Sequence, residues 1–252
     1  KRVQLSNHLN KIYIATGTSS TNDLLVDHLK DIKGIKVFRG DDNDVLERFY
    51  QIANIEKADI IVRLTGDCLL IDPSIIDLVL SLIIRDKSDY ASNTIKRTYP
   101  DGLDVEAFTY KALKKTYKMA KDQYAREHVT SYMHGLSKNS KSNGLFKKSS
   151  LENNVDFSHL RWTLDEEKDL ELLKIIYANI NNKDSWLKII SFLLTQPLLV
   201  MRNQEVPENE GVKTKKNIIN KYNESNKYFK RSSNLVPLGS QTFSKSHIQW
   251  PK

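Results

Sequence analysis

Two aspartates of this chain each follow an apolar segment and precede a helix-like stretch. Asp67 lies in the small-residue turn after Ile60–Val62, and Asp165 directly follows the segment His159–Leu164. In an open α/β sheet, ligands bind at the carboxyl ends of the strands, so two such acids can meet at one edge. Two carboxylates, completed by phosphate oxygens and water, form the oxygen donor set that Mg²⁺ takes. Asp67 and Asp165 therefore predict a site for Mg²⁺ on a nucleotide phosphate.

Both acids also have a structural interpretation, which the residues alone leave open. Aspartate is favoured at the N-cap of a helix, where its carboxylate accepts backbone N–H groups. On that interpretation Asp67 caps the turn before Pro73, and Asp165 caps the helix that begins near Glu166. Convergence of the two side chains separates the alternatives.

Two arginines stand out by their positions in the expected elements. Arg48 lies four residues after Asp44 on one face of an expected helix. The two form either a surface ion pair worth roughly 0.2–0.5 kcal/mol, or a site in which Arg48 faces the nucleotide. Arg63 lies inside an expected strand, where a charge needs a partner or a cleft. We favour the cleft for Arg63.

Three acids surround the strong turn Tyr99–Gly102, in which proline sets one backbone torsion and glycine permits a positive φ. Asp101, Asp104 and Glu106 form either the polar face of a hairpin with a half-exposed strand, or a carboxylate cluster that binds sugar hydroxyls. Further along, His128 has no cysteine, serine or second histidine at a catalytic or metal-binding spacing. A structural role for His128 therefore competes with a catalytic one.

Strands and helices alternate along the first half of the chain. Apolar runs predict buried strands, and apolar positions three and four apart predict the helices between them. This alternation indicates an α/β fold with a mostly parallel sheet and helices on both faces. The expected strands cover 12–16, 36–39, 59–65, 89–93, 103–108 and 159–164. The expected helices cover 20–30, 44–57, a segment from Pro73, 110–120, 124–135, 166–180 and 184–194, with a polar loop at 138–150.

Charge and hydropathy exclude several classes of partner. The net charge is +8, but residues 201–252 hold ten lysines and arginines against four glutamates, so the first 200 residues carry only about +2. This distribution does not favour nucleic-acid binding, which needs basic residues on a folded face. The apolar runs are shorter than the roughly 18 residues that span a bilayer. We therefore expect neither a nucleic acid nor a membrane as a partner, and the single cysteine, Cys68, suits the cytoplasm.

Five segments, in this order, resemble the spore-coat-polysaccharide type of cytidylyltransferase. That family is related to the acylneuraminate and 3-deoxy-manno-octulosonate cytidylyltransferases. The segments are Val62–Pro73, Ser92-Asn93, Tyr99–Glu106, Arg126–Thr130 and Thr163–Asp165, and Asp44–Arg48 also fits. The resemblance covers about residues 1–200.

The resemblance implies a glycosyltransferase-A-like nucleotidyltransferase fold and a Mg²⁺-dependent reaction. A sugar oxygen would attack the α-phosphorus of a nucleoside triphosphate, with CTP favoured, and pyrophosphate would leave. Positioning and charge neutralisation would carry catalysis more than an acid or a base. The acceptor would be a sugar or sugar acid for surface polysaccharide synthesis. The protein could act as a homodimer, a question that the sequence leaves open.

The site residues that the resemblance implies fall into three groups. Asp67 and Asp165 would hold the metal and be catalytic. The nucleotide would be bound by Asp44, Arg48, Thr65 and Gly66. The sugar would be bound by Arg63, Asn93, Asp101, Asp104, Glu106, Glu127 and His128.

Both ends of the chain carry further expectations. The family's N-terminal strand and its glycine- and arginine-bearing phosphate loop are absent, so residues 1–200 are expected to be an N-terminally truncated domain of low stability and doubtful activity. Ser233–Ser246 resembles the opening of a class III aminotransferase of the glutamate-1-semialdehyde type, which uses pyridoxal phosphate (PLP). Residues 201–228 are interpreted as a linker and 229–252 as the start of that aminotransferase domain, in a fused parent protein.

Two other functions remain open. A glycosyltransferase on the same sheet would consume a nucleotide sugar, but it would normally carry Asp-x-Asp at the strand end, where this chain has Gly66-Asp67-Cys68. Alternatively, the domain is an inactive scaffold that tethers the aminotransferase. Release of pyrophosphate would separate an enzyme that makes a nucleotide sugar from both.

Overall fold

The strands form two separate sheets in the computed structural model, which describes residues 1–136, 144–196 and 199. In the smaller sheet, β1 (Ile12–Gly17) and β2 (Ile35–Gly40) pair in parallel. The larger sheet has the order β3-β5-β4-β6. Its strands are β3 (Ile60–Arg63), β4 (Tyr90–Ser92), β5 (Glu106–Thr109) and β6 (Lys148–Ser150).

Strand directions in the larger sheet are mixed. β5 runs antiparallel to both β3 and β4, and β6 runs parallel to β4, so three of the four strands point the same way. The expected α/β class with a mostly parallel sheet is therefore confirmed. The expectation of a half-exposed strand over 103–108 is wrong, because β5 is hydrogen-bonded on both edges and its residues Glu106–Phe108 are buried.

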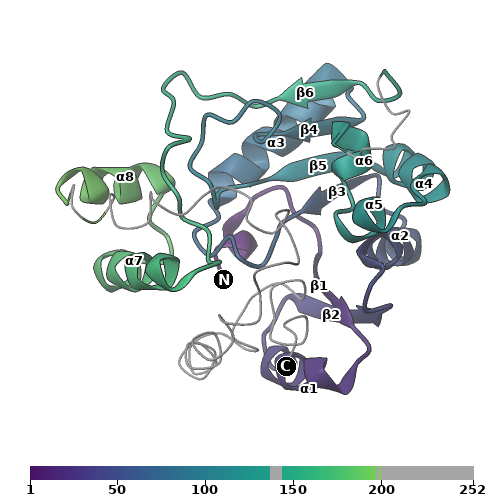
Figure 1. Ribbon diagram of the computed structural model, residues 1–252, viewed down its shortest axis with the longest axis horizontal. Coiled ribbons are helices and arrows are strands. Elements are labelled where there is room, and N and C mark those ends of the chain that lie inside the picture. Colours follow the sequence, from purple (N-terminus) through teal and green to yellow (C-terminus); the bar gives the residue numbers. More distant parts are fainter. Residues whose placement is uncertain (137–143, 197–198, 200–252) are drawn as a thin grey trace, which may run out of the picture.

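The helices lie around the larger sheet. In Figure 1, α7 and α8 lie at one end of it, α2, α4 and α5 lie at the other, and β1, β2 and α1 lie together below it. The helices are α1 (Asp23–Leu29), α2 (Val45–Glu56), α3 (Pro73–Asp86), α4 (Tyr110–Met119), α5 (Gln123–Glu127), α6 (Ser131–His134), α7 (Glu167–Asn179) and α8 (Trp186–Leu194). Two short 3-10 turns, η1 (Val3–Leu5) and η2 (Ser20–Asn22), complete the described elements.

Helix α3 shows how sequence signals set the element boundaries. Pro73 occupies its first turn, where the missing N–H costs nothing, and the Asp72 carboxylate accepts the Ser74 N–H at 2.8 Å. Lys87 ends the helix in the left-handed conformation. The apolar face of α3 packs with α7 and α8 into one core cluster, and α2, α4, α5 and α6 form a second.

Three expected elements differ in the structure. Residues 159–164 form no regular strand, because this segment pairs with loops and makes a single bridge, between Arg161 and Asp101. The expected helix over 124–135 is broken into α5 and α6 at Val129, which has a φ of +44°. Within the expected loop 138–150, residues Lys148–Ser150 instead form β6.

Several expectations about the ends of the chain stay predictions. The linker (201–228) and the aminotransferase resemblance (229–252) lie outside the described residues. The truncation of the first domain is likewise untested. In the described part of the chain, no helix has the length and apolar character that crossing a bilayer requires.

Candidate active site

The segment 160–165 brings the two aspartates together. The Leu164 N–H donates to the Asp67 carbonyl at 3.1 Å, so this segment lies beside the turn that follows β3. The Thr163 hydroxyl donates to Asp67 Oδ2 at 3.2 Å and is 3.4 Å from Asp165 Oδ2. Both carboxylates therefore lie next to one hydroxyl group. The Asp67 and Asp165 side chains thus lie near each other at this edge of the sheet, as they must if they are to bind one ion together.

The turn after β3 is compact and largely buried. Gly66 and Asp67 form the turn itself, and Asp67 is only 7% exposed. The Thr65 hydroxyl lies 3.2 Å from the Cys68 sulfur. Cys68 is buried, and burial raises the pKa of its thiol well above the ordinary value.

Arg161 and Asp169 form a clamp around Asp165 that the sequence-based search missed. Arg161 donates to both oxygens of the fully buried Asp169, at 3.0 and 2.9 Å, and to Asp165 Oδ2 at 2.9 Å. Asp169 also accepts the backbone N–H groups of Asp165 and Glu166, at 3.1 and 3.0 Å. The sequence held a signal for this arrangement, because an acid at the third helical position commonly reaches back to the N-cap backbone.

A second arginine, also missed, holds the acids of the Tyr99–Gly102 turn. Arg97 binds Asp104 through both oxygens, at 2.6 and 2.9 Å. Asp101 lies 3.4 Å from Arg97 and 3.6 Å from Arg161. Burial, reinforced by the negative charge of Asp104, raises the pKa of Asp101 to about 6 although both arginines oppose the shift. The two acids thus form one network with the clamp on Asp165.

Arg63 has a partner and not the cleft that its strand position favoured. It lies opposite Glu106 across β3 and β5, and the two side chains form a buried ion pair. The Tyr90 hydroxyl donates to the other Glu106 oxygen at 2.6 Å. Burial opposes ionisation of Glu106, but the Arg63 charge and the bond from Tyr90 outweigh it and hold the pKa of Glu106 below its ordinary value.

Of three other expected sugar-binding residues, Asn93 occupies a structural position, and the sugar contacts of Glu127 and His128 stay predictions. The buried Asn93 side chain accepts the Val105 N–H at 2.9 Å and donates to the Leu103 carbonyl at 2.8 Å. Both ends of its amide are therefore used to position the segment that carries Asp104. Glu127 and His128 lie at the C-terminal end of α5, where the His128 ring packs 4.3 Å from that of Tyr124.

The two expected nucleotide-binding residues of α2 also lie in defined contacts. Asp44 caps the helix by accepting the Glu47 N–H at 2.9 Å, and it pairs with Arg126 and not with Arg48. Arg48 is 2% exposed, and its Nη1 donates to the Ala15 carbonyl at 3.3 Å. Burial lowers the pKa of Arg48, with nearby acids opposing the shift. Its buried Nε has no hydrogen-bond partner among the described residues.

The donor set around Asp67 suits an ion that is delivered with phosphates. Among the described residues, no group of three or more histidines, cysteines or acids could hold a metal unaided. Mg²⁺ is usually bound by one or two carboxylates and completes its shell with water and substrate phosphates. Two carboxylates beside one hydroxyl fit that pattern.

The fold, with acids at the carboxyl edge of its sheet, is that of an α/β nucleotidyltransferase. A cytidylyltransferase from Leptospira borgpetersenii serovar Hardjo-bovis has a similar structure, with a TM-score of 0.72 and 31% identity over 79% of this chain and 82% of that one. Residues 1–183 match the family described as cytidylyltransferase, and the chain belongs to that family.

Two curated proteins are also similar in sequence. An uncharacterised protein of Methanocaldococcus jannaschii is 33% identical over 210 residues, which cover 82% of each chain. The spore coat polysaccharide biosynthesis protein SpsF of Bacillus subtilis is 31% identical over 176 residues, 68% of this chain and 69% of that protein.

Proposed function

We propose that this chain transfers a cytidylyl group from CTP to a sugar or sugar acid and releases pyrophosphate, with Mg²⁺ at Asp67 and Asp165. Membership of the cytidylyltransferase family supports the choice of CTP. The name of the Bacillus subtilis relative supports a role in surface polysaccharide synthesis. In the reaction, a sugar oxygen forms a bond to the α-phosphorus as the bond to the pyrophosphate oxygen breaks.

The observation that carries the proposal is the Thr163 hydroxyl, which lies within 3.4 Å of both carboxylates. When bound there, Mg²⁺ would offset the negative charge of the phosphates and of the transition state. Thr163 and the Leu164 N–H keep Asp67 and Asp165 adjacent, and Asp169 keeps Arg161 beside Asp165. These contacts hold the site before the substrate arrives, which limits the cost of reorganisation.

The remaining residues divide between the two substrates. On the sugar side, Asp101 and Asp104 offer carboxylate oxygens to hydroxyl groups, while Arg97 fixes their positions. On the nucleotide side, Thr65 and Gly66 precede Asp67 in the turn after β3. Arg48 lies beneath β1 and keeps a buried Nε donor without a partner among the described residues. Such a donor would gain a hydrogen bond from a nucleotide oxygen.

Pyrophosphate release from the full chain tests this function. The chain is offered each of the four nucleoside triphosphates with a panel of sugars and sugar acids. Asp67→Asn and Asp165→Asn are each expected to slow turnover by at least about 100-fold. Mn²⁺ binding, followed by water-proton relaxation, should weaken in both variants, and the exposed Asp31→Asn should leave both measurements unchanged.

Two results would reject the proposal. Full activity in both aspartate variants would remove the metal assignment. Absence of pyrophosphate with every nucleotide would instead favour the scaffold, and consumption of a nucleotide sugar would favour the glycosyltransferase.

A further inference from the structure

Helix α4 presents a face of lysines that no acid interrupts. Its sequence has lysines at 111, 114, 115 and 118 and no aspartate or glutamate, and Lys121 follows directly after the helix. Positions three and four apart share one face of a helix. Lys111, Lys114 and Lys118 are exposed on that face and Lys121 is exposed just beyond the C-cap Ala120, while Ala112, Leu113 and Thr116 are buried on the opposite face of the helix. We call these four residues the lysine face.

The charge of the lysine face is not neutralised by its surroundings. None of its four members forms an ion pair or a hydrogen bond with another described residue. Of the acids near it, Asp44 and Glu47 pair with Arg126, and Asp122 caps α5 at the Ala125 N–H. By contrast, the exposed Asp59, whose carbonyl accepts the Tyr110 N–H at 2.9 Å, lies beside the start of α4. The first 200 residues carry only about +2 in total, so this concentration of one sign is local. Surfaces of soluble domains normally mix both signs.

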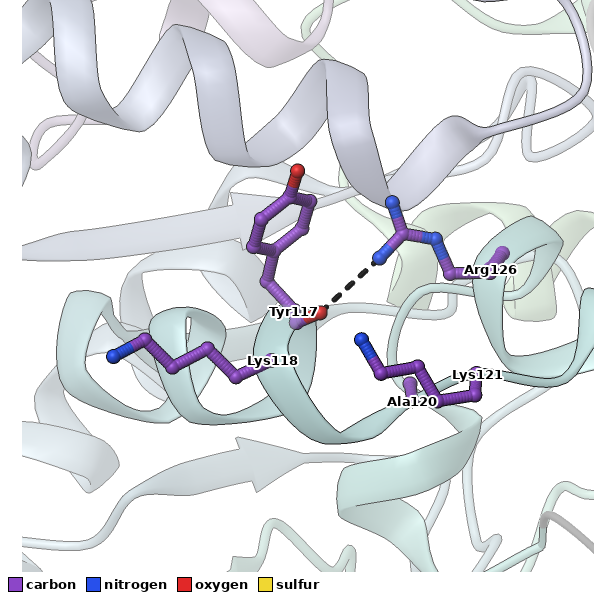
Figure 2. Close-up of a pocket in the computed structure, with 5 residues that line it drawn as sticks. All are labelled: Tyr117, Lys118, Ala120, Lys121 and Arg126. Atoms are coloured by element: carbon purple, nitrogen blue, oxygen red, sulfur yellow. Dashed lines mark hydrogen bonds between the residues drawn. The ribbon is translucent and has the colours of Figure 1, made fainter.

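A hollow lies at the C-terminal end of the lysine face. It has a volume of about 360 Å³ and is lined by Tyr117, Lys118, Ala120, Lys121 and Arg126. Figure 2 shows the Lys121 ammonium pointing toward the end of α4, close to the guanidinium of Arg126. Arg126 donates to the Tyr117 carbonyl at 3.2 Å and is held in place by Asp44. The hollow therefore combines the fixed Arg126 guanidinium with the Lys121 ammonium, while the Lys118 ammonium points away along α4 (Figure 2).

We propose that the lysine face docks on an anionic membrane surface and that the hollow receives the phosphate of a lipid headgroup. Clusters of four or more basic residues on one helix are typical of binding to anionic lipids. Met119 and Tyr124, 42% and 40% exposed, lie next to this cluster in the sequence, and they offer an apolar side chain and an amphipathic ring to the membrane interface. The inference goes beyond the proposed transfer reaction and does not depend on it. It departs from the expectation that a membrane is not a partner, which rested on apolar runs too short to span a bilayer and does not concern docking at the surface.

The neighbouring aromatic rings argue against a nucleic acid as the occupant. Single-stranded nucleic acids are bound by aromatic faces that are open for stacking on bases. Here Tyr50 stacks on Tyr117, with centroids 4.1 Å apart, and on Tyr110 at 6.3 Å. The Arg126 guanidinium lies 4.7 Å from the Tyr117 ring centroid. The ring faces of Tyr50, Tyr110 and Tyr117 are thus used within the protein.

Vesicle sedimentation of the full chain tests the proposal. Vesicles of phosphatidylcholine with and without phosphatidylglycerol are compared at low and high salt. Lys114→Gln/Lys118→Gln should weaken partitioning onto the anionic vesicles by about 30-fold, which is the loss expected for two lysines. The matched control is Lys174→Gln/Lys183→Gln, which makes the same change of charge at exposed positions of the α7 region, away from α4 in Figure 1. Residues 201–252 are the same in every variant, so their charge cannot account for a difference in vesicle binding between variants.

Location is measured separately, by NMR with spin-labelled lipid headgroups. Broadening of the amides of 111–121, but not of α7, supports docking through α4. An equal loss in the control variant, or no loss in the lysine-face variant, would overturn the proposal. So would a lysine-face variant that loses binding to a single-stranded oligouridine but not to vesicles, or a hollow that binds inorganic phosphate when no vesicle binds.

Discussion

The two sheets of this protein differ in how their strands are buried. Every residue of β4 and all of β5 except Thr109 are buried, and both strands contribute to the core clusters. In β1 and β2, by contrast, only Thr16 and Gly17 are buried. Neither strand supplies a member of the two clusters that the described residues form, although Ile12, Ile14, Ile35 and Val37 are as apolar as the residues of β4.

This difference shows that paired backbone groups do not make a core. The β1–β2 ladder satisfies its N–H and C=O groups in parallel register, yet the net stabilisation from each hydrogen bond is small. Burial of apolar area supplies most of the driving force for folding, and the smaller sheet has little of it. Polar contacts hold its end instead, with Arg39 donating to the Gly17 and Ser19 carbonyls at 3.1 and 2.8 Å.

Hydrogen exchange should reveal the largest contrast between the sheets. Amides of β4 and β5 should exchange only on global unfolding, whose free energy is about 5–15 kcal/mol in ordinary domains. Amides of β1 and β2 should exchange at least about 1000-fold faster, because local opening exposes little apolar area. Mass spectrometry of peptides from both sheets measures this directly, and equal protection would refute the comparison.

The next largest contrast is expected between Arg63 in the larger sheet and Arg39 in the smaller sheet. The two should differ in how much each contributes to the free energy of unfolding. Arg63→Met leaves Glu106 buried without its ion pair and should cost about 3–5 kcal/mol of unfolding free energy. Arg39→Met breaks a partly exposed pair with Asp23 and should cost about 1 kcal/mol. Urea unfolding provides the values. The double variant Arg63→Met/Glu106→Gln should recover part of the loss, and no recovery would show that the charge of Glu106 is not the cause.

Two glycines extend the comparison to backbone packing. Gly102 has a φ of +99°, and an added Cβ would lie 2.5 Å from the Trp162 carbonyl carbon and 2.6 Å from the Thr163 nitrogen. Gly102→Ala should therefore cost about 2–4 kcal/mol, because neither the torsion nor the backbone can adjust cheaply.

Gly17→Ala is the matched substitution in the smaller sheet. Its Cβ would meet the Asp42 carboxylate, a side chain that can rotate away, and should cost about 1 kcal/mol. Thermal unfolding of both variants shows which of them loses more stability. A larger loss from Gly17→Ala would mean that the smaller sheet, and not the Tyr99–Gly102 turn, is the more rigid region.

The effect expected at Asp101 is smaller than those of Arg63→Met and Gly102→Ala and depends on pH. Because its native pKa is raised from 3.8 to about 6, the folded state binds the proton more tightly than the unfolded state. The stability contributed by this group therefore falls as the pH rises from about 4 to about 6. Asp101→Asn should be more stable than the parent by roughly 1–2 kcal/mol at pH 7.5, with no gain near pH 4.

Thermal unfolding at both pH values measures this difference, with the exposed Asp31→Asn as a control that should show no such dependence. A gain of equal size at both pH values would mean that the carboxylate charge is not responsible. Reduced activity in the more stable Asp101→Asn would agree with its proposed contact with the sugar.

Local signals in the sequence predicted the parts of the fold that depend on neighbouring residues. The start of α3 at Pro73 and the positive φ of Gly102 follow from the steric limits of proline and glycine, and both are confirmed. The order of motif-like segments such as Val62–Pro73 indicated the family, which the comparisons show. Asp67 and Asp165 were singled out by strand-end position, and the structure brings them together, while their role stays a prediction.

What the sequence determined by itself was therefore the α/β class, the position of most helices and the acids worth examining, because these depend on torsions and spacing within short segments. Only the tertiary structure decided that β5 lies between two strands, that Arg63 pairs with Glu106, and that Asp67 lies beside Thr163 and Asp165. Burial and charge pairing join residues that are distant in the chain, so no local pattern encodes which of them will meet.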